Sequence, residues 1–350
     1  MTRMRAALRI FRLPCALLAG AVLANPLLAS PASSGPPQRP AARAGPAPVP
    51  PQAAAAPAKP LPPQDLLLAC PTTRDYVGRV VAEVMVDGKG PFRFIIDTGA
   101  NQSTIAPRLA AALGLTPSAR EPIRIAGVTG TAIVPSVRIE SLRAGALNIT
   151  HTRLPVIWSP IMAGADGILG AAGLDKDTLL VDFQRNAVEI RRAGSGVSTG
   201  NVRLRAKRLQ GGLLSVPGEV GDVRVTAIID TGSPRTLANM ALYRILYSDV
   251  RAGDKGVTTS VYGATKQVRP GEVHMTPAIN LGAIRIAKPL LVFGDFPIFD
   301  TWGLERHPAI ILGMDVLGTV NAFSIDFRYA KLSLVAPQVY YADAHEPFPN

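Results

Sequence analysis

Two short stretches of the same kind constrain the fold of this chain more than any other feature. The first, residues 94–100, reads Phe-Ile-Ile-Asp-Thr-Gly-Ala, and the second, residues 227–233, reads Ala-Ile-Ile-Asp-Thr-Gly-Ser. Each is an apolar strand that ends in a carboxylate, a hydroxyl and a glycine. A charge at the end of an apolar strand costs free energy unless another group pairs with it. Because the two copies lie 133 residues apart, we expect Asp97 and Asp230 to need each other.

The sequence around each copy repeats as well. Each Asp follows a strand-turn-strand pattern, and the turns are Asp87-Gly88 and Gly221-Asp222, where glycine accepts positive φ at no cost. Downstream, residues 167–170 read Gly-Ile-Leu-Gly and residues 310–313 read Ile-Ile-Leu-Gly. Leu-Val-Asp-Phe at 180–183 then matches Ser-Ile-Asp-Phe at 324–327. The order is the same in both halves, with one insertion of roughly ten residues in the second, which indicates an internal duplication.

These motifs resemble those of the aspartic protease superfamily, specifically its bacterial retropepsin-like branch. That family carries Asp-Thr-Gly followed by Ala or Ser, and later two apolar residues and a glycine. Both halves match, with Ile168-Leu169-Gly170 in the first and Ile311-Leu312-Gly313 in the second, and the resemblance covers residues 73–338. It implies a mostly β, bilobal acid-protease fold, in which two duplicated β-barrel-like lobes with short helices flank a cleft.

The resemblance also implies a catalytic role for Asp97 and Asp230. Two carboxyls that share a proton activate a water as general base and protonate the scissile carbonyl and the leaving amine. Gly170 and Gly313 would let the chain pass close under each Asp strand. In the resembled family the two threonines interlock beneath the carboxyls, and the glycines let backbone N–H groups approach them. The residues expected to support the pair are Thr98, Gly99, Ala100, Thr231, Gly232 and Ser233.

One difference between the motifs predicts unequal aspartates. Ala100 follows Gly99, whereas Ser233 follows Gly232. A serine hydroxyl that donates to Asp230 would favour its ionised form. We therefore expect Asp230 to be the carboxylate and Asp97 to hold the shared proton.

A glycine-bearing hairpin is expected in each half. Strands at 123–125 and 133–139 flank residues 127–130, and strands at 258–262 and 267–275 flank Gly263. In the resembled family the first hairpin closes over the substrate as a flap; the alternative is an ordinary hairpin. The candidate substrate-binding residues are Gly127, Thr129, Gly130, Tyr262 and Gly263.

Short helices are predicted at 107–115 and at 237–246, from apolar runs that begin at Pro or after a turn. Strands at 147–157, 179–183 and 187–190 are expected to complete the first lobe. The insertion near residues 293–306, with Trp302, either shapes specificity or covers the core.

The N-terminal segments are expected to lie outside the fold. Residues 1–30 combine a basic start with a short apolar run and read as a signal peptide, with an uncleaved membrane anchor as the alternative. Residues 31–72 are rich in Pro and Ala and read as a disordered linker, or as a propeptide. The two lobes then occupy residues 73–195 and 201–338.

Charge and composition limit the classes of partner and cofactor that we expect for this chain. The net charge is +12, but seven basic residues and no acid lie within residues 1–60, which leaves only +5 for the rest. Without a basic-aromatic cluster, this argues against nucleic acid. The two cysteines, Cys15 and Cys70, leave no internal disulfide after signal cleavage, and the four scattered histidines have no metal-site spacing. We expect no metal, no cofactor and no stable membrane span.

The sequence therefore predicts an aspartic endopeptidase that acts on extended polypeptides in the periplasm or outside the cell. Because one chain supplies both aspartates, we expect a monomer with an intramolecular site. The first alternative is an inactive peptide-binding module on the same fold. The second, a glycosidase, would separate its two carboxyls by about 5 Å or more.

Overall fold

The computed structural model describes residues 15–16, 70–71, 73–74, 78–194, 201–248 and 256–337. The predicted signal peptide and linker lie outside the described residues except for two short strands, β1 (Cys15–Ala16) and β2 (Cys70–Pro71). Residues 195–200, where the first predicted lobe ends and the second begins, and residues 338–350 also lie outside them.

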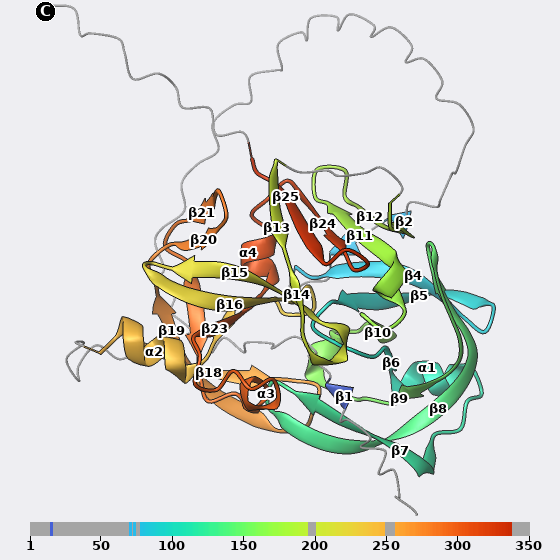
Figure 1. Cartoon of the computed structure of the whole chain (residues 1–350). Coiled ribbons are helices and arrows are strands. Elements are labelled where there is room, and N and C mark those ends of the chain that lie inside the picture. Colours follow the sequence, from blue (N-terminus) through green and yellow to red (C-terminus); the bar gives the residue numbers. More distant parts are fainter. Residues whose placement is uncertain are drawn as a thin grey trace, which may run out of the picture. The chain divides into compact units, whose positions relative to one another are not determined.

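The first half of the chain builds a nine-stranded sheet (Figure 1). Its elements are β3 (Thr73–Arg74), β4 (Val80–Val86), β5 (Lys89–Asp97), β6 (Thr104–Ile105), α1 (Pro107–Ala112), β7 (Ser118–Gly127), β8 (Gly130–Ala144), β9 (Leu147–Pro155) and β10 (Gly167–Gly170). The strand order is β1-β7-β8-β4-β5-β10-β6, with β3 beside β4 and β9 beside β8. The β4–β5 turn lies at Asp87 and Gly88, both with positive φ, as its sequence predicts. Strand β10 runs parallel to β5 and ends opposite Asp97.

The second half repeats this arrangement in a ten-stranded sheet. Its elements are β14 (Lys207–Arg208), β15 (Leu214–Val220), β16 (Val223–Ile229), β17 (Leu237–Ala238), α2 (Met240–Leu246), β18 (Val257–Tyr262), β19 (Val268–Met275), β20 (Ile279–Leu281), β21 (Ile284–Ile286), β22 (Leu290–Phe293), α3 (Pro297–Thr301), β23 (Ala309–Leu312) and α4 (Met314–Leu317). Strands β15 and β16 form the hairpin, and β23 runs parallel to β16 as β10 does to β5. Strand β17 is antiparallel to β23, as β6 is to β10. The duplication read from the sequence is thus present in the strand pairing.

A third sheet joins the two halves. It contains β11 (Asp177–Asp182), β12 (Ala187–Arg192), β13 (Val202–Arg205), β24 (Ala322–Asp326) and β25 (Lys331–Val335), in the order β13-β25-β24-β11-β12-β2. The sequence analysis assigned the strands at 179–183 and 187–190 to the first lobe. In the structure β11 pairs with β24 of the second half, with Val181 opposite Phe323. Both side chains are buried, so this pairing fixes one half of the chain against the other.

Both predicted helices are shorter than expected. Helix α1 ends at Ala112, two residues before Gly114, which has φ of 72°. The helix predicted over 237–246 begins only at Met240, because Leu237 and Ala238 pair with β22 and β23 instead. The Asn239 side chain caps α2 by accepting from the N–H of Leu242 at 3.1 Å. In the predicted insertion, α3 packs Ile298 and Phe299 into the interior.

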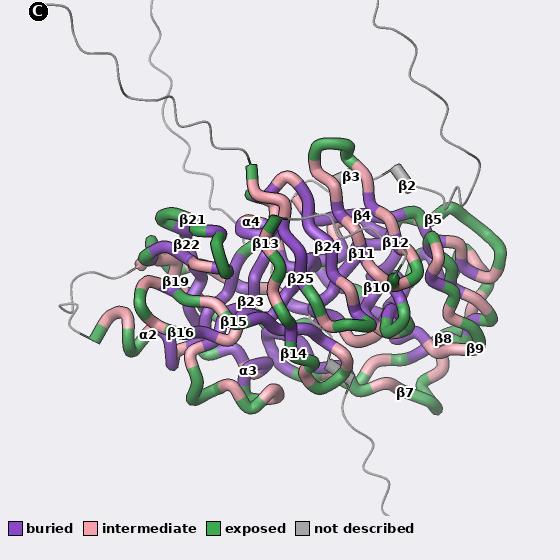
Figure 2. The backbone as a smooth tube through the Cα atoms, turned by 45° about the horizontal axis from the view of Figure 1, so that its top comes forward, coloured by how far each residue is buried: buried purple, intermediate pink, exposed green. Residues whose placement is uncertain are grey.

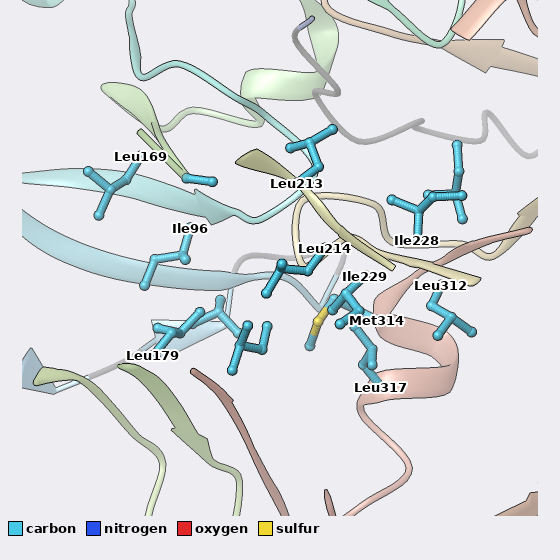
Figure 3. Packing of buried hydrophobic residues seen from close by; sticks show 14 of the residues in the cluster. Ile96, Leu169, Leu179, Leu213, Leu214, Ile228, Ile229, Leu312, Met314 and Leu317 are labelled. Carbon is cyan, nitrogen blue, oxygen red and sulfur yellow. The ribbon is translucent and has the colours of Figure 1, made fainter. Parts of the chain in front are cut away.

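The strands that carry the two motifs lie in the core. Figure 3 shows Ile96 and Leu169 of the first half in the same buried cluster as Ile228, Ile229 and Leu312 of the second. Figure 2 shows buried segments along the middle of the strands, whereas hairpin ends such as the turn between β20 and β21 are exposed. The mostly β, bilobal architecture expected from the sequence is confirmed. Within the described part of the chain, no helix is long and apolar enough to cross a membrane.

Candidate active site

The fold brings Asp97 and Asp230 together, one from each half. Asp97 is the last residue of β5, and Asp230 directly follows β16. Both are fully buried, and each carboxyl lies within hydrogen-bonding reach of the other. The neighbouring glycines are part of this approach, because a Cβ on Gly99 would lie 2.4 Å from Cγ of Asp230 and one on Gly232 would lie 2.2 Å from Cγ of Asp97. No larger residue fits at either glycine without separating the carboxyls.

Backbone N–H groups hold the two carboxyls unequally. Gly99 donates to Oδ1 of Asp97 at 2.9 Å. Oδ1 of Asp230 accepts two such bonds, from Gly232 at 2.8 Å and from Ser233 at 3.0 Å. Among the described residues no protein donor reaches the Oδ2 atom of either aspartate. These two oxygens are therefore the ones available to share a proton.

The expected role of the Ser233 hydroxyl is wrong. Its Oγ donates to the backbone carbonyl of Arg235 at 2.7 Å rather than to Asp230. Ser233 contributes to the carboxylate through its backbone N–H, which any residue except proline supplies. Ala100, its counterpart, donates its N–H to the backbone carbonyl of Asp97 at 3.2 Å.

These contacts shift the pKa values of the two carboxyls differently. Burial raises the pKa of Asp97 well above its ordinary value, and the charge of Asp230 raises it further. Burial also raises the pKa of Asp230, but the hydrogen bonds from Asp97, Gly232 and Ser233 oppose that rise. Backbone hydrogen bonds therefore favour the charged form of Asp230 more than that of Asp97. The inequality comes from backbone N–H groups and not from the serine hydroxyl.

The two threonines interlock beneath the aspartates. Thr98 Oγ1 donates to the carbonyl of Ile229 at 2.8 Å and accepts from the N–H of Thr231 at 3.2 Å. Thr231 Oγ1 donates to the carbonyl of Ile96 at 2.7 Å and accepts from the N–H of Thr98 at 3.1 Å. Each hydroxyl therefore binds the backbone of the opposite motif, which ties the two halves together directly under the carboxyls.

Gly170 and Gly313 sit where their strands pass close to the motif loops. A Cβ on Gly170 would lie 2.6 Å from the backbone of Gln102, and one on Gly313 would lie 2.4 Å from that of Arg235. The N–H of Gly313 donates to Thr236 Oγ1, whose hydroxyl in turn donates to the half-buried carboxylate of Asp315. The first half uses Ser103 in the place of Thr236, since its Oγ accepts from the N–H of Gly170 at 3.1 Å.

The glycine-bearing hairpins of the two halves contact each other. The turn after β7 contains Thr129, whose Oγ1 lies 2.9 Å from Oγ1 of Thr265, in the turn after β18. Arg269 Nε donates to the carbonyl of Thr129 at 3.2 Å, and a Cβ on Gly263 would lie 2.7 Å from Thr129 Oγ1. Gly127 and Gly130 flank this buried turn. The five candidate substrate-binding residues thus meet in one place, where β7, β8, β18 and β19 come close together (Figure 1).

A small apolar cluster connects these hairpins to the Asp97 loop. It includes Ala100 beside the first motif, Ile125 on β7 and Ala264 in the second hairpin, and Tyr262 packs against it half-buried. With the hairpins in contact, both aspartates are shielded from solvent.

The sequence analysis missed two residues of this region. Ser159 donates its hydroxyl to the carbonyl of Gly263 at 2.7 Å and so ties the segment after β9 to the second hairpin. Arg79 lies fully buried beside the aspartates and acts on the pKa of both. Its position directly before the strand that pairs with the Asp97 strand was the available signal.

A protein-family model matches regions in both halves of the chain. The family model described as aspartyl protease matches residues 82–172 and 216–316. These two regions contain the two motifs, both hairpins, and the strands β10 and β23. No curated protein matches the chain.

Proposed function

The chain belongs to the aspartyl protease family, and we propose that it is an aspartic endopeptidase that hydrolyses peptide bonds with a water activated by Asp97 and Asp230. The observation that carries this proposal is the pair itself: two buried carboxyls, one from each half, within hydrogen-bonding reach of each other. Two carboxyls this close cannot both ionise, so one proton is shared between them.

The unequal carboxyls support a division of roles. Asp230 ionises first, so it accepts a proton from the attacking water as general base. Asp97 holds the shared proton and donates it to the scissile carbonyl oxygen. As the tetrahedral intermediate collapses, the roles exchange and the leaving amine is protonated. The pair titrates as one unit, so the limbs of a pH profile belong to the pair.

The expected substrate is an extended polypeptide. Hairpins that must part to admit it favour a chain without tertiary structure. Carboxyls within hydrogen-bonding reach lie closer than the about 5 Å that paired carboxylates of retaining glycosidases need, which argues against the glycosidase alternative.

The test is hydrolysis of an unstructured protein by the purified chain, from roughly pH 3 to 8, with and without a statine-type inhibitor. We expect cleavage within the chain of the substrate and its loss when the inhibitor is present. Tight binding of the inhibitor without any cleavage would instead support the inactive peptide-binding module.

We also propose that the protein is exported. The basic start and short apolar run of residues 1–30 support this. N-terminal sequencing of the chain from a periplasmic or culture fraction should find the start removed. Recovery of the protein from the cytoplasm with its N-terminus intact would reject export.

A further inference from the structure

A buried positive charge lies next to the aspartate pair, Asp97 and Asp230. Arg79 is 0% exposed and is the one basic side chain among the described residues that is buried to this degree. A guanidinium keeps its charge throughout the working pH range of an enzyme. Burying such a charge is costly unless a negative group compensates it. The position of Arg79 in the sheet shows which negative groups are close.

The strand register places Arg79 across from Asp97. Strands β4 and β5 are antiparallel, with Val81 opposite Ile95. Continued by two residues beyond this ladder, the same register brings Arg79 opposite Asp97. Residues directly opposite in an antiparallel pair project from the same face of the sheet. Val81 and Ile95 belong to the apolar cluster that also contains Ala100, so this is the face that carries the Asp97 carboxyl.

The duplicated half has no charge at the equivalent place. Strands β15 and β16 pair Ser215 with Ile228, so the same step of two residues brings Leu213 opposite Asp230. Leu213 is also fully buried, and Figure 3 shows it within the hydrophobic cluster. The core therefore accepts an apolar side chain at this position in one half. The fold therefore does not require an arginine at the equivalent position of the first half.

We propose that Arg79 is a positioning residue of the catalytic site, whose guanidinium is the fixed counter-charge of the aspartate pair and holds it in the singly ionised form. This inference rests on the proposed function. Only the singly ionised pair has both a base for the water and an acid for the carbonyl. One negative charge on the pair and one positive charge on Arg79 leave the buried site neutral overall.

The charges around the pair support this role. Apart from the aspartates themselves, Arg79 is the charged group with the largest effect on the pKa of Asp97 and of Asp230. Burial is the largest cause and raises the pKa of both carboxyls, and the Arg79 charge lowers both. Loss of the Arg79 charge should therefore make the first and the second proton harder to remove.

The experiment compares Arg79→Met with Arg79→Lys, and uses Leu213→Met as the matched control in the other half. Carbon-13 NMR of the aspartate carboxyls follows the titration without turnover, and the pH profile of kcat/KM follows it in catalysis. In Arg79→Met we expect both limbs to move to higher pH by about one unit or more. In Arg79→Lys, which keeps a charge, both limbs should lie nearer to those of the wild type. In Leu213→Met neither limb should move. Unmoved limbs in Arg79→Met would overturn the proposal.

A comparison of thermal unfolding in two backgrounds tests the proposal if Arg79→Met does not fold in the wild-type background. The substitution is then compared in the wild type and in the Asp97→Asn/Asp230→Asn double variant, which lacks the negative charge of the pair. We expect Arg79→Met to be less destabilising in the double variant, or to restore its folding. Equal destabilisation in both backgrounds, or failure to fold in both, overturns the proposal. If the wild type hydrolyses nothing, only the proposed function fails, because the NMR titration and the unfolding comparison still test Arg79.

Discussion

At the scale of single residues, the aspartates differ because of the backbone around them. Asp230 accepts two backbone N–H groups on one oxygen, and Asp97 accepts one. Hydrogen bonds to a carboxylate stabilise its charged form. The loop after Asp230 thus favours a negative charge on this carboxyl through its backbone rather than through a side chain.

Ser233→Ala tests this directly. The Ser233 hydroxyl bonds the carbonyl of Arg235, so its removal should leave the acidic limb of the kcat/KM profile where it is. The protein should lose about 0.5–1.5 kcal/mol of unfolding free energy, the usual net worth of a hydrogen bond. A limb that moves to higher pH by one unit would show that the hydroxyl does act on Asp230.

At the scale of elements, the threonine interlock couples the loops after β5 and β16. Each hydroxyl satisfies a carbonyl and an N–H of the opposite loop, and all these groups are buried. A buried backbone group without a partner costs about 1–3 kcal/mol. The interlock therefore contributes both stability and the geometry of the carboxyls.

Thr98→Val keeps the shape of the side chain but removes its hydroxyl. It leaves the carbonyl of Ile229 and the N–H of Thr231 unsatisfied, and we expect a loss of about 2 kcal/mol or more in unfolding free energy. Thr98→Ser is the control, since it keeps the hydroxyl and loses a methyl group worth about 1 kcal/mol. Chemical denaturation measures both. Equal stability of the Val and Ser variants would mean that the interlock carries no free energy.

The contact between the hairpins predicts that catalysis needs them to part. With Thr129 Oγ1 and Thr265 Oγ1 at 2.9 Å, the Thr129→Cys/Thr265→Cys variant should form a disulfide under oxidation. We expect the oxidised variant to lose hydrolysis of an unstructured protein and to regain it on reduction. Each single cysteine variant is a control for oxidation alone. Full activity of the cross-linked protein would show that the substrate enters by another route.

Local chemistry explains which of these elements the sequence could predict. The Asp87-Gly88 turn and the close approach of the chain at Gly170 and Gly313 were predictable from residues in and near the motifs. The short strand at Leu237 could not be predicted in this way, since its partners, Val292 and Ile311, lie far along the chain. The sheet shared by both halves escaped prediction for the same reason.

The candidate site was predictable to a similar degree. The duplication was sufficient to pair Asp97 with Asp230, but not to orient the Ser233 hydroxyl, whose partner is set by the local turn. Arg79 was hidden by an irregularity between Val84 and Val86. Counting back from the Asp87-Gly88 turn without that shift places Gly78, not Arg79, opposite Asp97.

At the scale of the whole molecule, one chain supplies everything that the proposed reaction needs. The shared sheet and the threonine interlock hold the two halves together without a second subunit. A two-fold enzyme built from separate copies must dimerise to place its two aspartates side by side. The duplication removes that requirement.

Specific activity should accordingly be independent of protein concentration. We expect hydrolysis per molecule to stay constant over a hundredfold dilution, roughly the range over which a weak dimer dissociates. Light scattering at the same concentrations checks the mass of the species present. Activity that collapses on dilution, together with a fall in mass, would indicate that the site needs a second chain.

The most direct test of the account is the turnover of Asp97→Asn and of Asp230→Asn, each measured alone. Asparagine preserves the size of the side chain but can neither share the proton nor serve as the base. If the two carboxyls act as one unit, each variant should lose hydrolysis of an unstructured protein by about a thousandfold or more, while thermal unfolding shows an intact fold. Near wild-type turnover in either variant would contradict the shared pair.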